Sequence, residues 1–230
     1  MPEITSEKAL VLSSRRFSER KWIVTVFTGN NGKIAGVLNK KQPPETGTFV
    51  SVRWQARLSE QLGTLYLEEI IPFSVSYLDD KKRLACLSSL CVLLNDTLPE
   101  RQVFSELYRK TFHFLEQLDK PDFLRCYALF ERDLLEELGF GFDLTVCAGG
   151  GDANDLAYVS PKTGRAISRE KGLPYHQKLL VLPRFFWKDE PANEKDIQDA
   201  LHLTGYFLNQ HTFHHKLPEI RKRLMTLIQH

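Results

Sequence analysis

The sequence predicts an α+β protein built from a small β-barrel or curled sheet followed by an α-helical part. Two observations lead to this fold class. Short apolar runs with the alternation of strands, separated by turn residues, fill residues 8–72. From Asp79 onward the apolar residues recur at helical spacing instead. Because the pattern changes between Pro72 and Asp80, we expect one domain over residues 1–78 and a second over residues 79–230.

Turn residues separate the strand candidates. GNNG at residues 29–32 carries Asn and Gly, which tolerate the positive φ angles of a hairpin turn. Two prolines break the loop at residues 40–47. Between residues 49 and 54, Phe49, Ser51 and Arg53 alternate with Val50, Val52 and Trp54. A basic connector at residues 15–21 follows the first strand. The predicted strands cover residues 8–14, 22–28, 33–40, 49–58 and 62–71.

The second part carries apolar stripes typical of amphipathic helices. The first stripe is Leu84, Leu87, Cys91 and Leu94. Two further stripes cover residues 103–115 and 123–138, and Gly139 follows the latter where a helix ends. Residues 194–210 and 216–229 predict two more helices. A Gly-rich segment at about residues 144–174 predicts an irregular but compact insert.

Charge divides the chain unevenly. The first 57 residues hold ten Lys and Arg against four Asp and Glu, a net charge of +6. The whole chain is +2, so residues 58–230 sum to −4. A basic, β-rich end suits a polyanion, and nucleic acid is the first interpretation. The DNA-contact candidates are Arg15, Arg16, Arg20, Lys21, Lys33, Lys40, Lys41, Arg53 and Arg57.

Aromatic residues accompany the first four of these cations. Phe17 and Trp22 lie within or beside the basic connector, where exposed rings would stack on bases. The structural alternative is a solvated hairpin with Trp22 facing the core. A second basic strip, Arg221, Lys222 and Arg223, lies on the terminal helix. It is either an ordinary solvated face or a strip for DNA or an acidic peptide.

No motif indicates metal binding or catalysis. The four cysteines form no CxxC pair, and the histidines near residue 211 lack a neighbouring carboxylate or an HExxH motif. GGGD at residues 149–152 lacks the Lys–Ser/Thr of a phosphate-binding loop, so we expect a structural turn. Serines occur without a nucleophile-elbow motif. We therefore expect no catalytic residue, no metal and no cofactor.

The sequence also favours a cytoplasmic protein, because it has neither a signal-peptide core nor an apolar stretch near the ~18 residues of a membrane span. Two alternatives to a DNA-binding protein stay open. One is a non-enzymatic protein-interaction scaffold with a small β-barrel adaptor, which would bind DNA no tighter than millimolar near physiological salt. The other is an enzyme with a pocket between the two parts, which would need convergent titratable groups.

The order of these features resembles the bacterial recombination mediator family RecO. The similarity begins with Ala9 to Leu12, a basic turn with Phe17 and Glu19, Val24 to Thr28 and Gly32 to Ile34. It continues with LLEELGF at residues 134–140, Asp143, Leu144 and Cys147. Tyr158 to Pro161 with Gly164 completes the set. Each motif is loose alone, but their order and spacing together are specific.

The resemblance implies an N-terminal OB-fold and an α-helical second domain. It implies binding of single- and double-stranded DNA, annealing of complementary strands, and help in loading recombinase onto coated single-stranded DNA, at the nucleoid. The implied partners are RecR and the acidic C-terminal tail of the single-stranded DNA-binding protein. That tail would need an apolar pocket with a basic rim, for which the sequence offers Arg109, Lys110, Arg125 and Arg132.

The chain departs from the resemblance at one place. Some members of the family bind zinc through two cysteine pairs in the irregular segment. Here Ala148, Gly149 and Gly150 follow Cys147, and no cysteine lies near residues 166–169. We therefore expect no zinc, with Tyr158, the glycines and local packing holding the segment.

Overall fold

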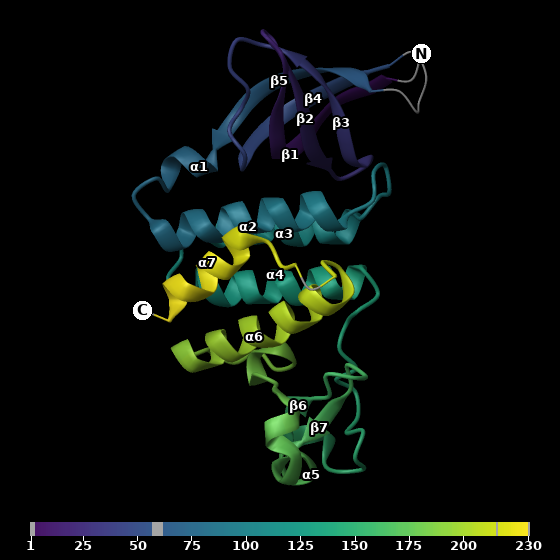
Figure 1. The fold of residues 1–230 in the computed structure, drawn as a ribbon, viewed down its shortest axis with the longest axis vertical. Helices are drawn as coiled ribbons and strands as arrows, with labels where there is room; N and C mark the ends of the chain where they lie inside the picture. Colours follow the sequence, from purple (N-terminus) through teal and green to yellow (C-terminus); the bar gives the residue numbers. More distant parts are fainter. Residues whose placement is uncertain (1–2, 57–61, 215, 230) are drawn as a thin grey trace. The chain divides into compact units, whose positions relative to one another are not determined.

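A computed structural model describes residues 3–56, 62–214 and 216–229. The chain divides into two compact units, Met1–Phe112 and His113–His230 (Figure 1). The first unit holds the barrel, α1 (Phe73–Ser76), α2 (Lys81–Thr97) and the first part of α3 (Ser105–Gln117). This division lies further along the chain than the domain boundary that we expected at residue 78. The expected boundary stays a prediction.

The β-rich part is a closed five-stranded barrel with the strand order β1-β2-β3-β5-β4. It confirms the predicted barrel followed by helices. The strands β3 and β5 run parallel and the other pairs antiparallel. The pairing of β3 with β5 closes the barrel, which shortens the strand edges open to another chain. The strands are β1 (Glu3–Ser18), β2 (Lys21–Thr28), β3 (Gly32–Asn39), β4 (Thr48–Gln55) and β5 (Gly63–Pro72).

Alternation along the strands fills the barrel. Val50, Val52 and Trp54 of β4 point into the core, where they meet residues such as Ala9 and Val11 of β1. Their neighbours Leu10 and Leu12 are also buried but lie outside that core cluster. Both faces of the strand are therefore buried along the continuous apolar run of β1, as is usual for such runs.

Helices of the first unit cover part of the outer face of the barrel. Phe49 of β4 packs on Phe112 of α3 at 4.7 Å between ring centroids, and Phe27 of β2 packs on Tyr108 at 5.5 Å. The helix α2 lies against β1. It also approaches Gly47, where φ is +83° and an added Cβ would lie 2.8 Å from Leu87 Cδ2. Glycine is therefore required at this turn.

The basic connector is not a separate loop, contrary to the expectation. The strand β1 continues through Arg15 and Arg16, which pair with Ile23 and Trp22 of β2. The backbone of these residues completes the ladder while their charged side chains remain in solvent. Only Glu19 and Arg20 form the turn between the strands.

The second unit is built on α4 (Phe123–Glu137), α6 (Glu194–His211) and α7 (Glu219–Ile228) (Figure 1). The backbone N–H of Gly139, at φ +83°, helps to end α4, as predicted. The helix α6 begins with a capping box between Asn193 and Asp196. Among the described residues, no helix is long and apolar enough to cross a membrane.

The expected irregular insert contains regular structure. It holds the antiparallel strands β6 (Leu156–Val159) and β7 (Ala166–Ser168) and the short helix α5 (Arg169–Gly172). The strand β8 (Leu180–Val181), which follows the insert in the sequence, completes the sheet in the order β7-β6-β8. Strands of two to four residues carry too little alternation to be predicted.

Candidate nucleic-acid interface

The hairpin formed by β1 and β2 presents a group of exposed cations. Arg15, Arg16, Arg20 and Lys21 are all exposed, and within the described residues none of them forms an ion pair. Phe17 lies among them with 58% of its surface exposed. Four exposed cations and an exposed aromatic ring on one hairpin can reach phosphates and bases.

The loop after β3 brings two further lysines to the same end. Lys21 of β2, which directly follows the turn of the hairpin, pairs with Asn39, the last residue of β3, so Lys40 and Lys41 continue from a position beside that turn. Ser14 Oγ donates a hydrogen bond of 3.1 Å to the carbonyl oxygen of Pro44, which ties the loop to β1. We call the six cations together the basic end: Arg15, Arg16, Arg20, Lys21, Lys40 and Lys41. With Glu19 and Glu45 its net charge is +4.

Lys33 lies in a different environment. Its ammonium group donates a hydrogen bond to the carbonyl oxygen of Asn95, near the end of α2. Burial lowers the pKa of Lys33, while the nearby carboxylates of Glu100 and Asp96 act to raise it. A cation at a helix C-terminus stabilises the helix. We therefore assign Lys33 a structural role and leave it outside the interface.

Arg53 lies on β4, away from the hairpin along the barrel surface. Its guanidinium carbon is 4.6 Å from the ring centroid of Tyr66, which is directly opposite on β5. Tyr66 is not among the residues predicted to contact DNA, because those were chosen by positive charge. Arg57, the last predicted contact, lies outside the described residues.

Trp22 faces the core, which was the structural alternative to a role in base stacking. It is half-buried and packs against the barrel core, so its ring is not offered to a base. Phe17 is the aromatic residue of the hairpin that stays open to solvent.

The terminal helix corrects the expected second basic strip. Arg221 is fully buried and pairs with Glu131, which is also fully buried. Lys222 and Arg223 remain exposed on α7. The helical pattern alone predicted one solvent-exposed face for all three cations. It could not reveal the buried carboxylate that pairs with Arg221, because that carboxylate comes from a distant part of the sequence.

Lys222 borders a groove between α6 and α7 with a volume of about 370 Å³. Leu201, Leu217 and Met225 provide apolar surface, and Tyr206 lies beside them. His202 and Arg221 also line the groove. Among the described residues that line it, none is acidic. Lys222 forms an ion pair of 2.6 Å with Glu219 on its own helix.

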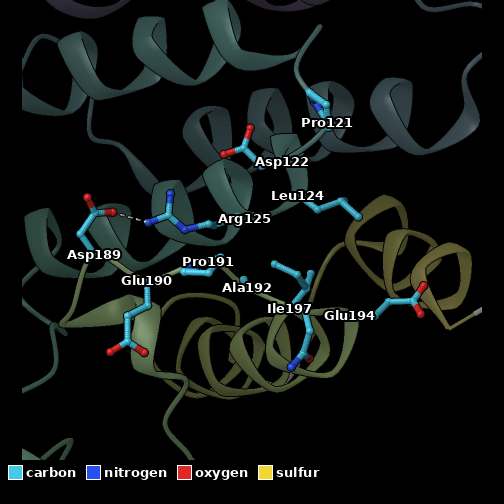
Figure 2. Close-up of a pocket in the computed structure, with 11 residues that line it drawn as sticks. Pro121, Asp122, Leu124, Arg125, Asp189, Glu190, Pro191, Ala192, Glu194 and Ile197 are labelled. Carbon is cyan, nitrogen blue, oxygen red and sulfur yellow. Dashed lines mark hydrogen bonds and ion pairs between the residues drawn. The ribbon is translucent and has the colours of Figure 1, made fainter.

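A second cavity, of about 460 Å³, has the opposite charge (Figure 2). The cation Arg125 lines it and forms an ion pair of 2.9 Å with the exposed Asp189. Four carboxylates line it: Asp122, Asp189, Glu190 and Glu194. The remaining lining is largely apolar: Pro121, Leu124, Pro191, Ala192 and Ile197.

The other expected rim cations are also engaged. Arg109 binds Glu106 at 2.6 Å, and Arg132 binds Asp133 and the carbonyl oxygen of Phe186. An acidic peptide at either position would have to displace an existing carboxylate or carbonyl. Lys222 is also paired, with Glu219, so the lining distinguishes the two cavities. Carboxylates line the cavity at Arg125, whereas none of the described residues lining the groove between α6 and α7 is acidic, so the groove is the better match to an acidic tail.

Cys147 is held by hydrogen bonds. Its sulfur accepts a hydrogen bond of 3.1 Å from the backbone N–H of Ser168. Burial acts to raise the pKa of the thiol, but hydrogen bonds from Ser168, Gly151 and Gly149 outweigh it and lower the pKa to about 7. Among the described residues, no group of three or more His, Cys, Asp and Glu side chains is placed to hold a metal ion.

The chain is similar to recombination protein O along most of its length. The family model for the recombination protein O N-terminal domain matches residues 1–72, and the model for its C-terminal domain matches residues 78–219. The DNA repair protein RecO of Rhodospirillum centenum is 38% identical over 231 residues, which cover 96% of this chain and 92% of that protein. The DNA repair protein RecO of Cereibacter sphaeroides is 39% identical, over 99% of this chain and 99% of that protein.

Proposed function

Because the chain belongs to the RecO family of DNA repair and recombination proteins, we propose that it is a recombination mediator. It binds single- and double-stranded DNA, anneals complementary strands, and helps to load recombinase onto single-stranded DNA coated by its binding protein. It works with RecR, in the cytoplasm at the nucleoid. The observation that carries this proposal is the basic end of the barrel.

Annealing requires no bond chemistry. Two strands repel each other through their phosphates, and cations that neutralise these phosphates lower the repulsion and release counterions. The basic end offers six cations on the hairpin and on the loop after β3, of which five are exposed and Lys40 is half-buried. Bases on strands held there stay free to meet their complements, since the cations act on the backbone of the DNA.

Fluorescence anisotropy of labelled single-stranded DNA across a salt series tests the proposal. The logarithm of affinity falls by about 0.7 per neutralised phosphate for each logarithmic unit of salt, so six contacts give a slope of roughly −4. Replacing Arg15 and Arg16 with Ala should reduce the steepness by about 1.4. The matched control is Lys195→Ala in α6, because Lys195 is an exposed cation outside the barrel.

Two results would count against this function. Absence of binding at low salt would favour a protein-interaction scaffold. An unchanged slope in the Arg15/Arg16 variant would remove the hairpin from the interface.

We further propose that the groove between α6 and α7 receives the acidic tail of the single-stranded DNA-binding protein. Its apolar surface suits an aromatic end, and Lys222 with His202 suits carboxylates, whereas the cavity at Arg125 is rimmed by carboxylates. An acidic peptide ending in phenylalanine, titrated into the full chain, serves as the probe. Lys222→Glu should weaken its binding at least tenfold, and Lys195→Glu should leave it unchanged. Equal losses in both variants would indicate only a general charge effect.

A further inference from the structure

A row of outward-facing side chains crosses four strands of the barrel. Lys21 of β2 pairs with Asn39 of β3, and Tyr66 of β5 pairs with Arg53 of β4. The strands β3 and β5 run parallel, and their last registered pair is Leu38 with Leu65. Asn39 and Tyr66 each follow that pair by one residue, so they continue one row on the outer face.

Burial confirms that this row faces solvent. Lys21, Asn39, Tyr66 and Arg53 are all exposed, whereas Leu38 and Leu65, which precede two of them, are 3% and 1% exposed inside the barrel. Neighbouring strands lie about 4.8 Å apart, so three steps from β2 to β4 extend roughly 14 Å. The row begins at Lys21, which belongs to the basic end, and finishes at a second cation.

Tyr66 is the aromatic member of the row. Its side chain is 46% exposed, although Arg53 lies 4.6 Å from its ring centroid. The two residues line a surface cavity of about 300 Å³ together with Ser51, Leu67 and Glu68. An open ring flanked by a guanidinium group matches a nucleobase and its phosphate, because bases stack on aromatic faces and arginine attracts the backbone.

Charge defines the path on either side of this ring. Cations at Lys21 and Arg53 bracket the row, while the exposed carboxylate of Glu68 lies two residues beyond Tyr66 on the same face of β5. Phosphates are attracted to the first two residues and repelled by the third. A strand that leaves the basic end is therefore directed along the row instead of along β5.

From this geometry we infer that Tyr66 is a base-stacking residue, and that a single DNA strand runs from the basic end across β3 and β5 to Arg53. The inference rests on the proposed function and adds a base contact to its phosphate contacts. Stacking requires an unpaired base whose face is open, and a duplex hides these faces. Tyr66 therefore favours single-stranded over double-stranded DNA, while the basic end binds both.

The test compares Tyr66→Ala, Tyr66→Phe and the parent chain on one oligonucleotide, single-stranded and as a duplex. Loss of one stacked base should weaken single-strand affinity about 5- to 150-fold. Duplex affinity should change less than twofold, and Tyr66→Phe should match the parent because it keeps the ring. Tyr175→Ala, at a 63% exposed tyrosine outside the barrel, is the matched control. An oligonucleotide containing 5-iodouracil should photo-crosslink to Tyr66 in the parent chain.

The outcomes separate this inference from the proposed function. If the parent binds single strands and Tyr66→Ala binds them within twofold of the parent, the stacking role is refuted and the phosphate contacts stand. Equal losses on single strands and duplex would also refute it, because a base contact discriminates between the two. If the parent binds no single-stranded DNA at low salt, the proposed function fails, and the stacking role fails with it.

Discussion

The buried ion pair between Arg221 of α7 and Glu131 of α4 gives a sharp prediction for the stability of the second unit. Both side chains are 0% exposed. Arg221 Nη2 donates hydrogen bonds of 2.8 Å to Glu131 Oε2 and to the carbonyl oxygen of Leu201. Tyr127 and Thr204 donate to the same carboxylate at 2.7 Å and 2.5 Å. Glu131 therefore joins α4 to both α6 and α7.

Arg221→Ala removes one partner and leaves a buried carboxylate without its cation. Loss of one partner of a buried pair costs about 3–5 kcal/mol. We expect the free energy of unfolding to fall by that amount in urea, followed by circular dichroism, since α4, α6 and α7 supply much of the helical signal. DNA affinity measured below the unfolding transition should stay at the parent value, because the basic end belongs to the other unit.

The double variant Glu131→Leu/Arg221→Met is the decisive control. Replacing a whole buried pair with apolar residues of similar volume is often neutral or stabilising. The double variant should therefore be more stable than Arg221→Ala, although it carries one more substitution. The reasoning is refuted if Arg221→Ala costs less than about 1 kcal/mol, or if the double variant is the less stable of the two.

Two further predictions concern Lys33 and Cys147. Lys33→Met should leave the DNA salt slope unchanged and lower the free energy of unfolding by about 1–3 kcal/mol, because the carbonyl oxygen of Asn95 loses its charged donor; a slope reduced as much as in the Arg15/Arg16 variant would return Lys33 to the interface. The pKa of Cys147 is lowered from 9.0 to about 7 in the folded chain, so the thiolate stabilises the fold above pH 9 and this contribution is lost as the pH falls through 7. The stability difference between the parent and Cys147→Ala in urea should therefore grow from pH 7 to pH 9, and a difference independent of pH would contradict the hydrogen-bonded thiolate.

Local patterns were sufficient to predict the barrel and the helices. Alternation in residues 49–54 matches the buried Val50, Val52 and Trp54, and the GNNG turn holds Gly32 at φ +66°. Both features depend on the period of the side chains and on backbone sterics within a few residues. The extension of β1 through Arg15 and Arg16 was missed, because these strand residues carry charges where the pattern predicted a connector.

Features that depend on a distant partner could not be predicted in the same way. Arg221 occupies a polar position in the helical pattern of α7, yet it is buried because Glu131 comes 90 residues earlier and faces it. A guanidinium group leaves water only where a carboxylate and further acceptors replace its hydration. Such an arrangement requires the packing of three helices, and no property of residues 216–229 alone contains it.

Tyr66 shows how the same limit applies to the candidate interface. The strand pattern of residues 62–71 places Tyr66 opposite in phase to Leu65 and Leu67, so its exposure follows from the sequence. Its relation to Arg53 depends on the register between β4 and β5, and its relation to Lys21 depends on the parallel pairing of β3 with β5. Net charge identified the basic part of the chain, but only closure of the barrel places the ring of Tyr66 in the same row as Lys21 and Arg53. A search for DNA contacts restricted to Lys and Arg therefore finds the phosphate contacts and misses the residue that we expect to distinguish single strands from duplex.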